Sequence, residues 1–461
     1  MKKYNNLIYL WWLTITASLG GLLFGYDTAV ISGTLSMVRS QFGLSAAMEG
    51  WYVSSALVGC VLGVSYAGWL SDKYGRKKVL LLAALLFTIS ALGCALIGSF
   101  SELIIYRFIG GMGVGIASML SPMYISEMSP PATRGRMVAL YQLAITAGIL
   151  GSYFINAWLL NQSSGENSIV NEKLILIFKS EVWRAMLGME AIPALLFFVL
   201  LLTVPESPRW LIIKGNITKA KTILIKYAVT DDANHELEEI QDSLEVEKES
   251  RNLILDPGIK LAIFLGVSLA VLQQFTGIDA IIYYGPRIME KAGFALNDAL
   301  GSQVIIGAIN MLFTLLAIWL IDKIGRKPLL LSGTFGMFLS LIVIGFLFFF
   351  NKAEGILLLS LILFFIASFA FSLGPVVWVI LSEIYPTKIR GRAMSIATMA
   401  VWIGTSMIGQ LIPLSLDNLG PSTTFWIFGF FCIPTMWIGW KLMPETKGKT
   451  LEEIERYWLK Y

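Results

Sequence analysis

The chain has 461 residues, of which 56% are hydrophobic and only 14% are charged, and its formal net charge is +4. A mean hydropathy of +0.71 nearly excludes a water-soluble enzyme, because too little polar surface remains to cover a soluble protein of this length. The small, scattered positive charge also argues against nucleic-acid binding. Lipid is therefore the expected solvent for most of the chain.

Apolar runs of about 20 residues, the length that crosses a bilayer as a helix, recur along the whole sequence. Twelve such runs lie near residues 8–32, 50–70, 79–98, 103–124, 135–160, 184–204, 258–285, 299–321, 328–350, 355–381, 392–415 and 423–443. The first run is longer than the apolar core of a signal peptide and has no small-residue cleavage site, so we expect it to be a membrane helix and not a cleaved leader. The sequence predicts an all-α protein with twelve transmembrane helices.

Lysine and arginine are distributed unevenly between the two sets of loops. Six lie on one side, namely Arg39, Lys173, Lys179, Arg287, Lys291 and Lys352. Twelve lie on the other side, namely Lys73, Arg76, Lys77, Lys78, Arg134, Arg136, Lys323, Arg326, Lys327, Lys388, Arg390 and Arg392. Because loops rich in positive charge stay in the cytoplasm, we expect both termini to be cytoplasmic.

One long polar segment divides the chain into two halves. We expect a first six-helix bundle over 1–205, a cytoplasmic linker with short helices over 206–257, a second six-helix bundle over 258–443, and a cytoplasmic tail over 444–461.

Three short motifs occur once in each half, in the same order. The loop with Asp72 recurs 250 residues later at Asp322, and the Ser-Glu pair ending in Glu127 recurs 256 residues later at Glu383. Pro205-Glu206-Ser207 recurs as Pro444-Glu445-Thr446, 239 residues later. Each copy lies at the cytoplasmic end of a predicted span, so the halves are expected to be pseudo-symmetric bundles with a transport site between them.

These motifs resemble the sugar porter family of the major facilitator superfamily over essentially the whole chain. The resemblance is carried by the doubled Asp-Lys-x-Gly-Arg-Lys loops, by Pro205-Glu206-Ser207-Pro208-Arg209, by Pro444-Glu445-Thr446-Lys447-Gly448, and by Gln273-Gln274-Phe275-Thr276-Gly277-Ile278. Segments 24–33 and 118–125 are most similar to the bacterial members that carry D-xylose with a proton. The resemblance implies the major facilitator fold and transport by alternating access.

Charged residues at the cytoplasmic ends of the spans suggest a latch between the bundles. Carboxylates near helix ends can form ion pairs with arginines of neighbouring loops, and such pairs must break when the carrier opens inward. The predicted members are Asp72, Arg76, Glu127, Arg134, Asp322, Arg326, Glu383 and Arg390. The alternative is that these charges only set the topology.

Three ionisable residues stand out inside predicted spans of the first bundle, where a charge is costly and usually functional. Asp27, Arg107 and Glu190 fall at depths that agree within one helical turn, so their side chains are expected to meet. Asp27 is then a proton switch, alternating between an ion pair with Arg107 and a protonated, unpaired state; the resemblance also implies a proton site at Asp27. The alternative is a static pair that fixes helix packing.

The substrate site is expected where amides and aromatic rings lie at mid-membrane depth. A sugar needs hydrogen-bond partners for its hydroxyls and an apolar or aromatic surface for its C–H faces. The residues that fit this pattern, or that match sugar-contacting positions of the family, are Phe24, Gln142, Gln273, Gln274, Tyr283, Asn310, Trp378 and Trp402. For a single buried amide, a hydrogen bond between helices is an equally good interpretation.

Two positions depart from the pattern of the family. Asp279 stands where xylose and glucose carriers have asparagine, and we include it among the substrate-binding residues. Val401 stands where those carriers have an amide. A carboxylate only accepts hydrogen bonds, so it changes which hydroxyl pattern fits, and Asp279 is either a sugar or polyol acceptor or a second titrating group.

Two glycine-proline pairs are predicted to bend helices beside the substrate site. Gly285-Pro286 is expected to end the seventh span and Gly374-Pro375 to interrupt the tenth, so both are candidate gates. Tyr283 and Tyr284 would close over the substrate. Ordinary proline kinks without a gating role are the alternative.

No residues indicate catalysis, a metal or a cofactor. Cys60, Cys94 and Cys432 lie in apolar segments without paired spacing, and His235 is the single histidine. The run from Gly110 to Gly115 lacks the dinucleotide-binding spacing and indicates close helix packing.

The sequence as a whole predicts a carrier that imports a monosaccharide, a pentose or hexose such as D-xylose or D-glucose, together with a proton. Its expected partners are the sugar, the proton and the lipid bilayer of a bacterial plasma membrane, and we expect it to work as a monomer. The alternatives are a polyol or inositol symporter, a facilitative uniporter, and a sugar sensor of the same fold, which usually has a longer tail.

Overall fold

The computed structural model describes residues 7–130, 133–163, 176–227, 237, 257–385, 389–449 and 451–458. For Arg134, Asp322 and Arg390 it describes the backbone but not the side chain, and His235 lies outside the described residues.

Twelve segments are long and apolar enough to cross a membrane, as the sequence predicts, and the described residues form helices without strands. The first six spans consist of α1 (Leu7–Phe42), α2 (Ala46–Tyr74), α3 (Arg76–Leu96), α4 (Phe100–Met128), α5 (Arg134–Ser163), and α7 (Trp183–Gly188) with α8 (Ala191–Thr203). The other six consist of α12 (Pro257–Phe275) with α13 (Ile278–Lys291), α14 (Leu296–Ile324), α15 (Arg326–Phe349), α16 (Gly355–Ala370) with α17 (Leu373–Ile384), α18 (Arg390–Asn418) and α19 (Gly420–Lys441).

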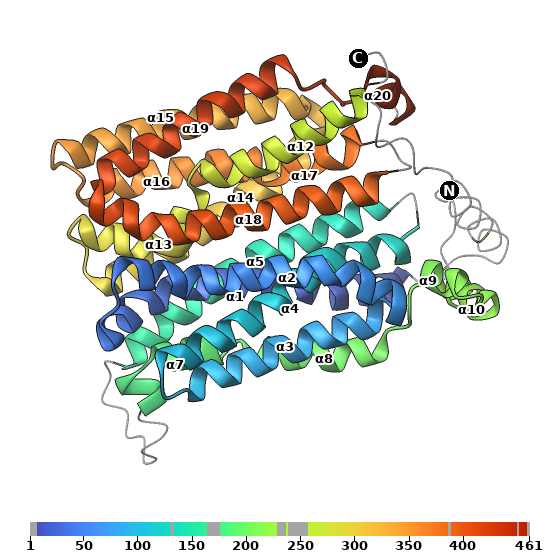
Figure 1. Ribbon diagram of the computed structural model, residues 1–461, viewed down its shortest axis with the longest axis horizontal. Helices are drawn as coiled ribbons and strands as arrows, with labels where there is room; N and C mark the ends of the chain where they lie inside the picture. The colour runs from blue at the N-terminus through green and yellow to red at the C-terminus, as the bar shows by residue number, and fades with distance from the viewer. Residues whose placement is uncertain are drawn as a thin grey trace.

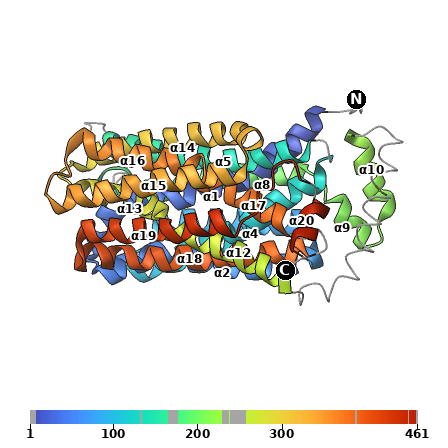
Figure 2. The ribbon, with the colours of Figure 1, turned by 90° about the horizontal axis from the view of Figure 1, so that it is seen from above.

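The spans form two bundles that lie side by side (Figure 1). We call the helices α1 to α8 the N bundle and α12 to α19 the C bundle. Helix α2 packs along α18, α5 along α14, and α1 against α13, and these three pairs join the bundles. The short helices α9 (Pro208–Ile213), α10 (Ile217–Tyr227) and α20 (Leu451–Trp458) lie beyond the span ends on one side (Figures 1 and 2). We call this side, where α1 begins and α19 ends, the terminal face, and the opposite side the loop face.

Three spans are broken in the middle. The breaks fall at 189–190 between α7 and α8, at 276–277 between α12 and α13, and at 371–372 between α16 and α17. A proline has no N–H group to donate to the carbonyl four residues earlier. For Pro193 and Pro375, that carbonyl belongs to a residue within the break. The other break contains Gly277, whose φ of +90° is the left-handed conformation that glycine adopts most easily. The predicted interruption beside Gly374-Pro375 is thus confirmed.

The seventh span does not end at Gly285-Pro286, as the sequence suggests. Helix α13 continues through Pro286 to Lys291. The carbonyl of Ile282, four residues before Pro286, accepts a hydrogen bond of 3.1 Å from the hydroxyl of Tyr153 on α5. Because a neighbouring helix supplies the missing donor, the proline is accommodated inside the helix.

Glycines on α4 allow it to pack directly on the backbone of α2. A Cβ atom on Gly111 would lie 1.8 Å from the carbonyl oxygen of Ala56, and one on Gly115 would lie 2.3 Å from that of Cys60. Only hydrogen atoms fit in these spaces. The glycine run of α4 therefore serves close helix packing, as predicted.

Candidate functional site

Asp27, Arg107 and Glu190 meet inside the N bundle, as the matching depths predict. Arg107 on α4 donates from Nη1 to Oδ1 of Asp27 on α1 at 2.5 Å. Glu190 interacts electrostatically with both residues, and its carboxyl group is directed at that of Asp27. All three side chains are buried, with exposures of 3%, 3% and 2% in chain order.

The break between α7 and α8 explains how Glu190 reaches this position. Glu190 is the residue before α8, so its carboxyl group lies at the positive end of the helix dipole. One Glu190 oxygen and the Nε of Arg107 are buried without a hydrogen-bond partner in the described part of the chain. Two carboxylates beside one guanidinium carry a net negative charge that a buried site stabilises poorly, and one bound proton would neutralise it. The trio can therefore hold one exchangeable proton.

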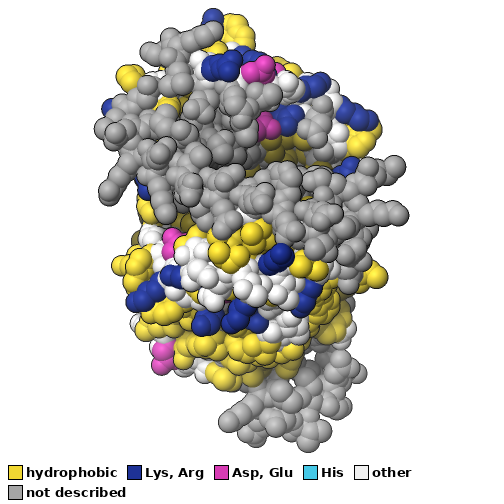
Figure 3. Space-filling model, turned by 90° about the vertical axis from the view of Figure 1, so that its right-hand side faces the viewer, with side chains coloured by type: hydrophobic (Ala, Val, Ile, Leu, Met, Phe, Trp, Pro, Cys, Tyr) yellow, Lys and Arg dark blue, Asp and Glu magenta, His cyan; other side chains and the backbone are white. Residues whose placement is uncertain are grey.

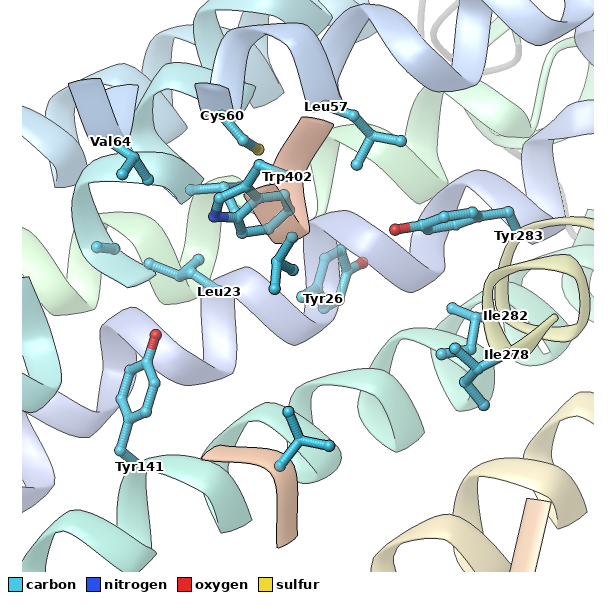
Figure 4. Close-up of a cluster of buried hydrophobic side chains, with 14 of the residues drawn as sticks. Leu23, Tyr26, Leu57, Cys60, Val64, Tyr141, Ile278, Ile282, Tyr283 and Trp402 are labelled. Atoms are coloured by element: carbon cyan, nitrogen blue, oxygen red, sulfur yellow. The ribbon is translucent and has the colours of Figure 1, made fainter. Parts of the chain in front are cut away.

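Aromatic rings from both bundles meet next to the trio. The rings of Phe24 on α1 and Trp402 on α18 lie 5.2 Å apart between centroids, at an interplanar angle of 51°. Figure 4 shows Trp402 among side chains of the N bundle, with Tyr26 and Cys60 close to its ring. These rings form an apolar surface of the kind that the sequence predicts for a sugar site.

The two predicted glutamines of α12 are ordered by hydrogen bonds. Gln273 donates to the carbonyl of Leu373, the first residue of α17, at 2.7 Å, and Gln274 donates to Gln273 at 3.3 Å. A Cβ atom on Gly404 would lie 3.6 Å from Cγ of Gln274, so Gln274 faces α18 at Gly404. Gln273 therefore holds the broken tenth span in place and orients Gln274.

Asp279 and Tyr283 lie on α13, directly after the break at Gly277. Asp279 is 5% exposed, and its Oδ2 atom has no hydrogen-bond partner in the described structure. Tyr283 is buried and interacts electrostatically with both Asp279 and Asp27. In Figure 4 its ring points toward Trp402 and Tyr26. Tyr283 is thus within electrostatic reach of both the buried ion trio and the unpartnered carboxylate.

Three further predicted substrate residues lie on α5, α14 and α17. Gln142 on α5 and Trp378 on α17 are half-buried, and Asn310 on α14 is buried. None of the three forms a side-chain hydrogen bond to a residue whose placement the structure describes. Their amide and indole groups remain available to a ligand.

The repeated motifs meet at one point on the terminal face of each bundle. In the N bundle, Arg76 forms a two-pronged ion pair with Glu127 at 3.1 and 3.2 Å, and Asp72 lies 3.1 Å from Arg76. Glu206 accepts the backbone N–H of Arg76 at 2.8 Å, so it caps the start of α3. Ser207 donates to Glu127, which joins the third motif to the second.

The C bundle repeats this arrangement at the side chains that the structure describes. Arg326 pairs with Glu383 at 3.1 and 2.7 Å, Glu445 accepts the backbone N–H of Arg326 at 3.1 Å, and Thr446 donates to Glu383. Gly75 and Gly325, at the turns before α3 and α15, have φ values of +102° and +107°. The internal repeat of the sequence is therefore a structural repeat as well.

The ion pairs of the predicted latch that the structure describes lie within the bundles. The pairs Arg76–Glu127 and Arg326–Glu383 each stay within one bundle. The side chains of Arg134, Asp322 and Arg390, which were also predicted to belong to it, lie outside the described part of the structure. In the conformation observed, the described charges hold helix ends within each bundle, and the latch between the bundles stays a prediction.

The two capping glutamates differ in their acidity. Burial raises the pKa of Glu206, although backbone N–H groups oppose this change. Burial also acts to raise the pKa of Glu445, but the backbone N–H donors of Lys447 and Arg326 outweigh it, and the net shift is downward. The cap of α3 therefore weakens at a higher pH than the cap of α15.

Removal of the α15 cap should reduce stability modestly. We expect Glu445→Ala to lower the free energy of unfolding by about 1 kcal/mol at neutral pH, because the first N–H groups of α15 lose their acceptor. A lowered pKa means that this contribution is complete at neutral pH and is lost as the pH falls through the pKa of Glu445. Thermal unfolding of purified protein measures it. Glu354→Ala is the control, because Glu354 precedes α16 without forming a cap bond, and an equal loss in both variants would refute the role of Glu445.

Sequence reasoning missed a charge cluster at the loop face. Arg287 on α13 contacts Glu49 on α2 at 2.5 Å and Asp417 on α18 at 2.9 Å, and Arg39 and Lys291 complete the group. From the sequence alone, its three basic members Arg39, Arg287 and Lys291 are identified only as loop charges. Arg287 and Lys291 lie four residues apart on α13, but the other members come from α1, α2 and α18, so no single spacing marks the whole cluster. The sequence offered two signals: this helical spacing and an acidic residue, Glu49, at the end of an apolar span.

Basic side chains gather on the terminal face, where Lys and Arg outnumber acidic groups in the space-filling view (Figure 3). Among the described residues, no group of three or more His, Cys, Asp or Glu residues could hold a metal ion.

Two six-helix bundles around buried polar and aromatic groups have the architecture of a secondary membrane transporter. The chain belongs to the sugar transporter family, whose model, described as "Sugar (and other) transporter", matches residues 13–458. It is 42% identical to the arabinose-proton symporter of Bacillus subtilis strain 168, covering 97% of this chain and 95% of that protein. It is 40% identical to the D-xylose-proton symporter of Escherichia coli K12, covering 99% and 97% respectively.

Solved structures show the same fold. The inward-open conformation of the xylose transporter of E. coli matches with a TM-score of 0.83 at 39% identity, covering 98% of this chain and all of that chain. These findings confirm the predicted family and the major facilitator fold, and they place the chain among transporters instead of enzymes.

Proposed function

We propose that this protein imports a monosaccharide, a pentose or a hexose, together with a proton, across a bacterial plasma membrane. The observation that carries the proposal is the buried trio of Asp27, Arg107 and Glu190 next to the aromatic and amide groups of the site. The two relatives compared above are symporters of a pentose and a proton, which supports the same coupling here.

The trio supplies the proton step. With Asp27 ionised, Arg107 holds it at 2.5 Å, and the pair is satisfied. A proton arriving from the loop face neutralises one of the two carboxyl groups and weakens the hold of Arg107, which frees α1 and α4 to move relative to each other. Such movement couples protonation to the position of Phe24, which lies one turn from Asp27 on α1.

The substrate would lie between the bundles. Gln274, oriented by Gln273, and Asn310 would exchange hydrogen bonds with sugar hydroxyls, and Gln142 would do so from the N bundle. Phe24, Tyr283, Trp378 and Trp402 would supply aromatic contact. Asp279 would accept from one hydroxyl, because it is buried and its Oδ2 is unpartnered.

The conformation observed is closed at the loop face. Ion pairs link the bundles there, whereas the described pairs on the terminal face stay within a bundle. We propose that the terminal face, where basic residues gather, is cytoplasmic and that the structure is closed to the outside.

The organisation of the chain follows from the same proposal. Residues 1–205 and 258–443 would be the two moving bundles, 206–257 a cytoplasmic linker and 444–461 a cytoplasmic tail, with both termini inside. The site lies within one chain, so we propose that the monomer is the working unit.

Uptake into proteoliposomes tests the function. Labelled D-xylose, D-glucose, L-arabinose and myo-inositol are offered with and without an inside-alkaline pH gradient. We expect gradient-driven accumulation of a pentose or hexose. Equilibration without accumulation would identify a facilitative uniporter, accumulation of myo-inositol alone would identify a polyol symporter, and exclusion of all four would refute the proposed substrate class.

A further inference from the structure

The charge cluster at the loop face joins the two bundles at buried positions. Arg287 donates from Nη1 to Glu49 at 2.5 Å, and from Nη2 to both oxygens of Asp417 at 2.9 Å. The side chain of Glu49 is 0% exposed and that of Arg287 is 5% exposed. Glu49 belongs to the N bundle and Arg287 to the C bundle, so this pair spans the interface. In such a weakly screened setting, a charge-assisted hydrogen bond is strong.

A second contact between bundles lies one turn along α13. Ser36 on α1 donates to Glu290 at 2.7 Å. A cavity of about 460 Å³ opens beside both contacts and is lined by Ser36, Arg39, Glu49, Arg287 and Glu290. The polar groups on its wall give water a place to enter when the pairs separate.

Tyr153 holds the same helix from another side. Its hydroxyl, on α5 of the N bundle, caps the carbonyl of Ile282 that Pro286 leaves without a donor. A matching contact ties α13 to its own bundle, where Tyr284 donates at 2.6 Å to the carbonyl of Gly409, which Pro413 leaves without a donor. Helix α13 is therefore tied to α18 of its own bundle, and separation from the N bundle must break the bonds to Glu49, Ser36 and Tyr153.

Separation of the bundles would leave each of the four residues Arg39, Glu49, Arg287 and Asp417 with an oppositely charged partner. Within the N bundle, Arg39 lies 3.5 Å from Glu49, and within the C bundle, Arg287 lies 2.9 Å from Asp417. Each half thus keeps one cation and one anion together when the halves part. A buried pair of only two residues would expose an uncompensated charge on opening and would be hard to break. The four-residue arrangement is suited to repeated opening and closing.

We propose that Arg39, Glu49, Arg287 and Asp417 form a charge latch that closes the outer side of the carrier, with Tyr153 as a second tie on α13. Arg287 and Glu49 are positioning residues that set the ratio of outward-open to outward-closed protein. The proposal rests on the proposed orientation and on alternating access, but not on which substrate is carried.

Distances between spin labels test the latch without any substrate. Leu96→Cys on α3 and Ile356→Cys on α16 place labels at exposed loop-face positions of the two bundles, and the native cysteines are buried. We expect Glu49→Gln and Arg287→Gln each to raise the ratio of long to short distances about tenfold or more, the usual size of a coupling between two conformations. An unchanged distance distribution in Glu49→Gln would overturn the proposal.

Further variants separate the latch from a general loss of structure. Glu181→Gln breaks the pair of Glu181 with Arg184, a loop-face ion pair that stays within the N bundle, and it should leave the distances unchanged. The double variant Glu49→Gln/Arg287→Gln should shift the ratio no further than either single change, because both remove one bond; additive shifts would contradict the pairing. Tyr153→Phe keeps the ring and removes only the hydroxyl, so it tests the outer closure if the charge variants fold poorly. If the latch variants shift these distances as expected but the native protein takes up no sugar, the proposed function is rejected and the latch proposal stands.

Discussion

Asp27→Asn should abolish accumulation of sugar against its gradient and leave exchange of sugar across the membrane. Each pH unit drives about a tenfold accumulation when one proton enters with one sugar, since a tenfold ratio corresponds to about 1.4 kcal/mol. Native protein should approach that ratio in proteoliposomes with an inside-alkaline gradient. The variant should reach a ratio of one, because asparagine cannot bind and release the proton, while the neutral side chain still fits beside Arg107.

The control separates coupling from folding. Asp298→Asn changes an exposed aspartate of α14 that takes no part in the site, and it should accumulate sugar like the native protein. Counterflow of labelled sugar without a gradient shows that each variant is folded and can bind substrate. If Asp27→Asn reaches an accumulation ratio above one, Asp27 and Arg107 only hold α1 against α4, and the proton travels by another route.

Much of the fold could be predicted because lipid imposes simple rules. Apolar length gives the spans, and the repeated motifs give the two bundles. The structure adds length to the predicted helices: α1 continues to Phe42, where the sequence suggested an end near residue 32. Hydropathy reports the part of a helix that faces lipid, whereas Ser36 and Arg39 belong to a part that faces the other bundle.

The meeting of Asp27, Arg107 and Glu190 was predictable because charges are rare within membranes and few depths are available. The helix breaks were harder to predict, because a proline has different effects in different surroundings. Pro375 interrupts its span, while Pro286 does not, since Tyr153 from a distant helix supplies the lost hydrogen bond. Tyr153 lies far from Pro286 in the sequence, so the residues around the proline do not reveal this contact.

Asp279→Asn should change which sugar is preferred and leave proton coupling intact. Asp279 is the second residue of α13, close to the positive end of the helix, and no side chain hydrogen-bonds to its Oδ2 in the described structure. It is thus placed to accept a hydrogen bond from a ligand hydroxyl, and asparagine would offer a donor as well. We expect the ratio of uptake efficiencies for D-xylose and myo-inositol to change about 10- to 100-fold, because gain or loss of one buried hydrogen bond to the ligand has an effect of this size.

The accumulation ratio of the same variant decides between the two roles of Asp279. If Asp279 only accepts a hydroxyl, the ratio per pH unit and its pH dependence should equal those of the native protein. If Asp279 carries a second proton, the native ratio should exceed the about tenfold limit for one proton, and Asp279→Asn should bring it down to that limit. Asparagine also tolerates the first turn of a helix, so thermal unfolding should change little, and a large loss of stability would assign Asp279 to the structure of α13 instead.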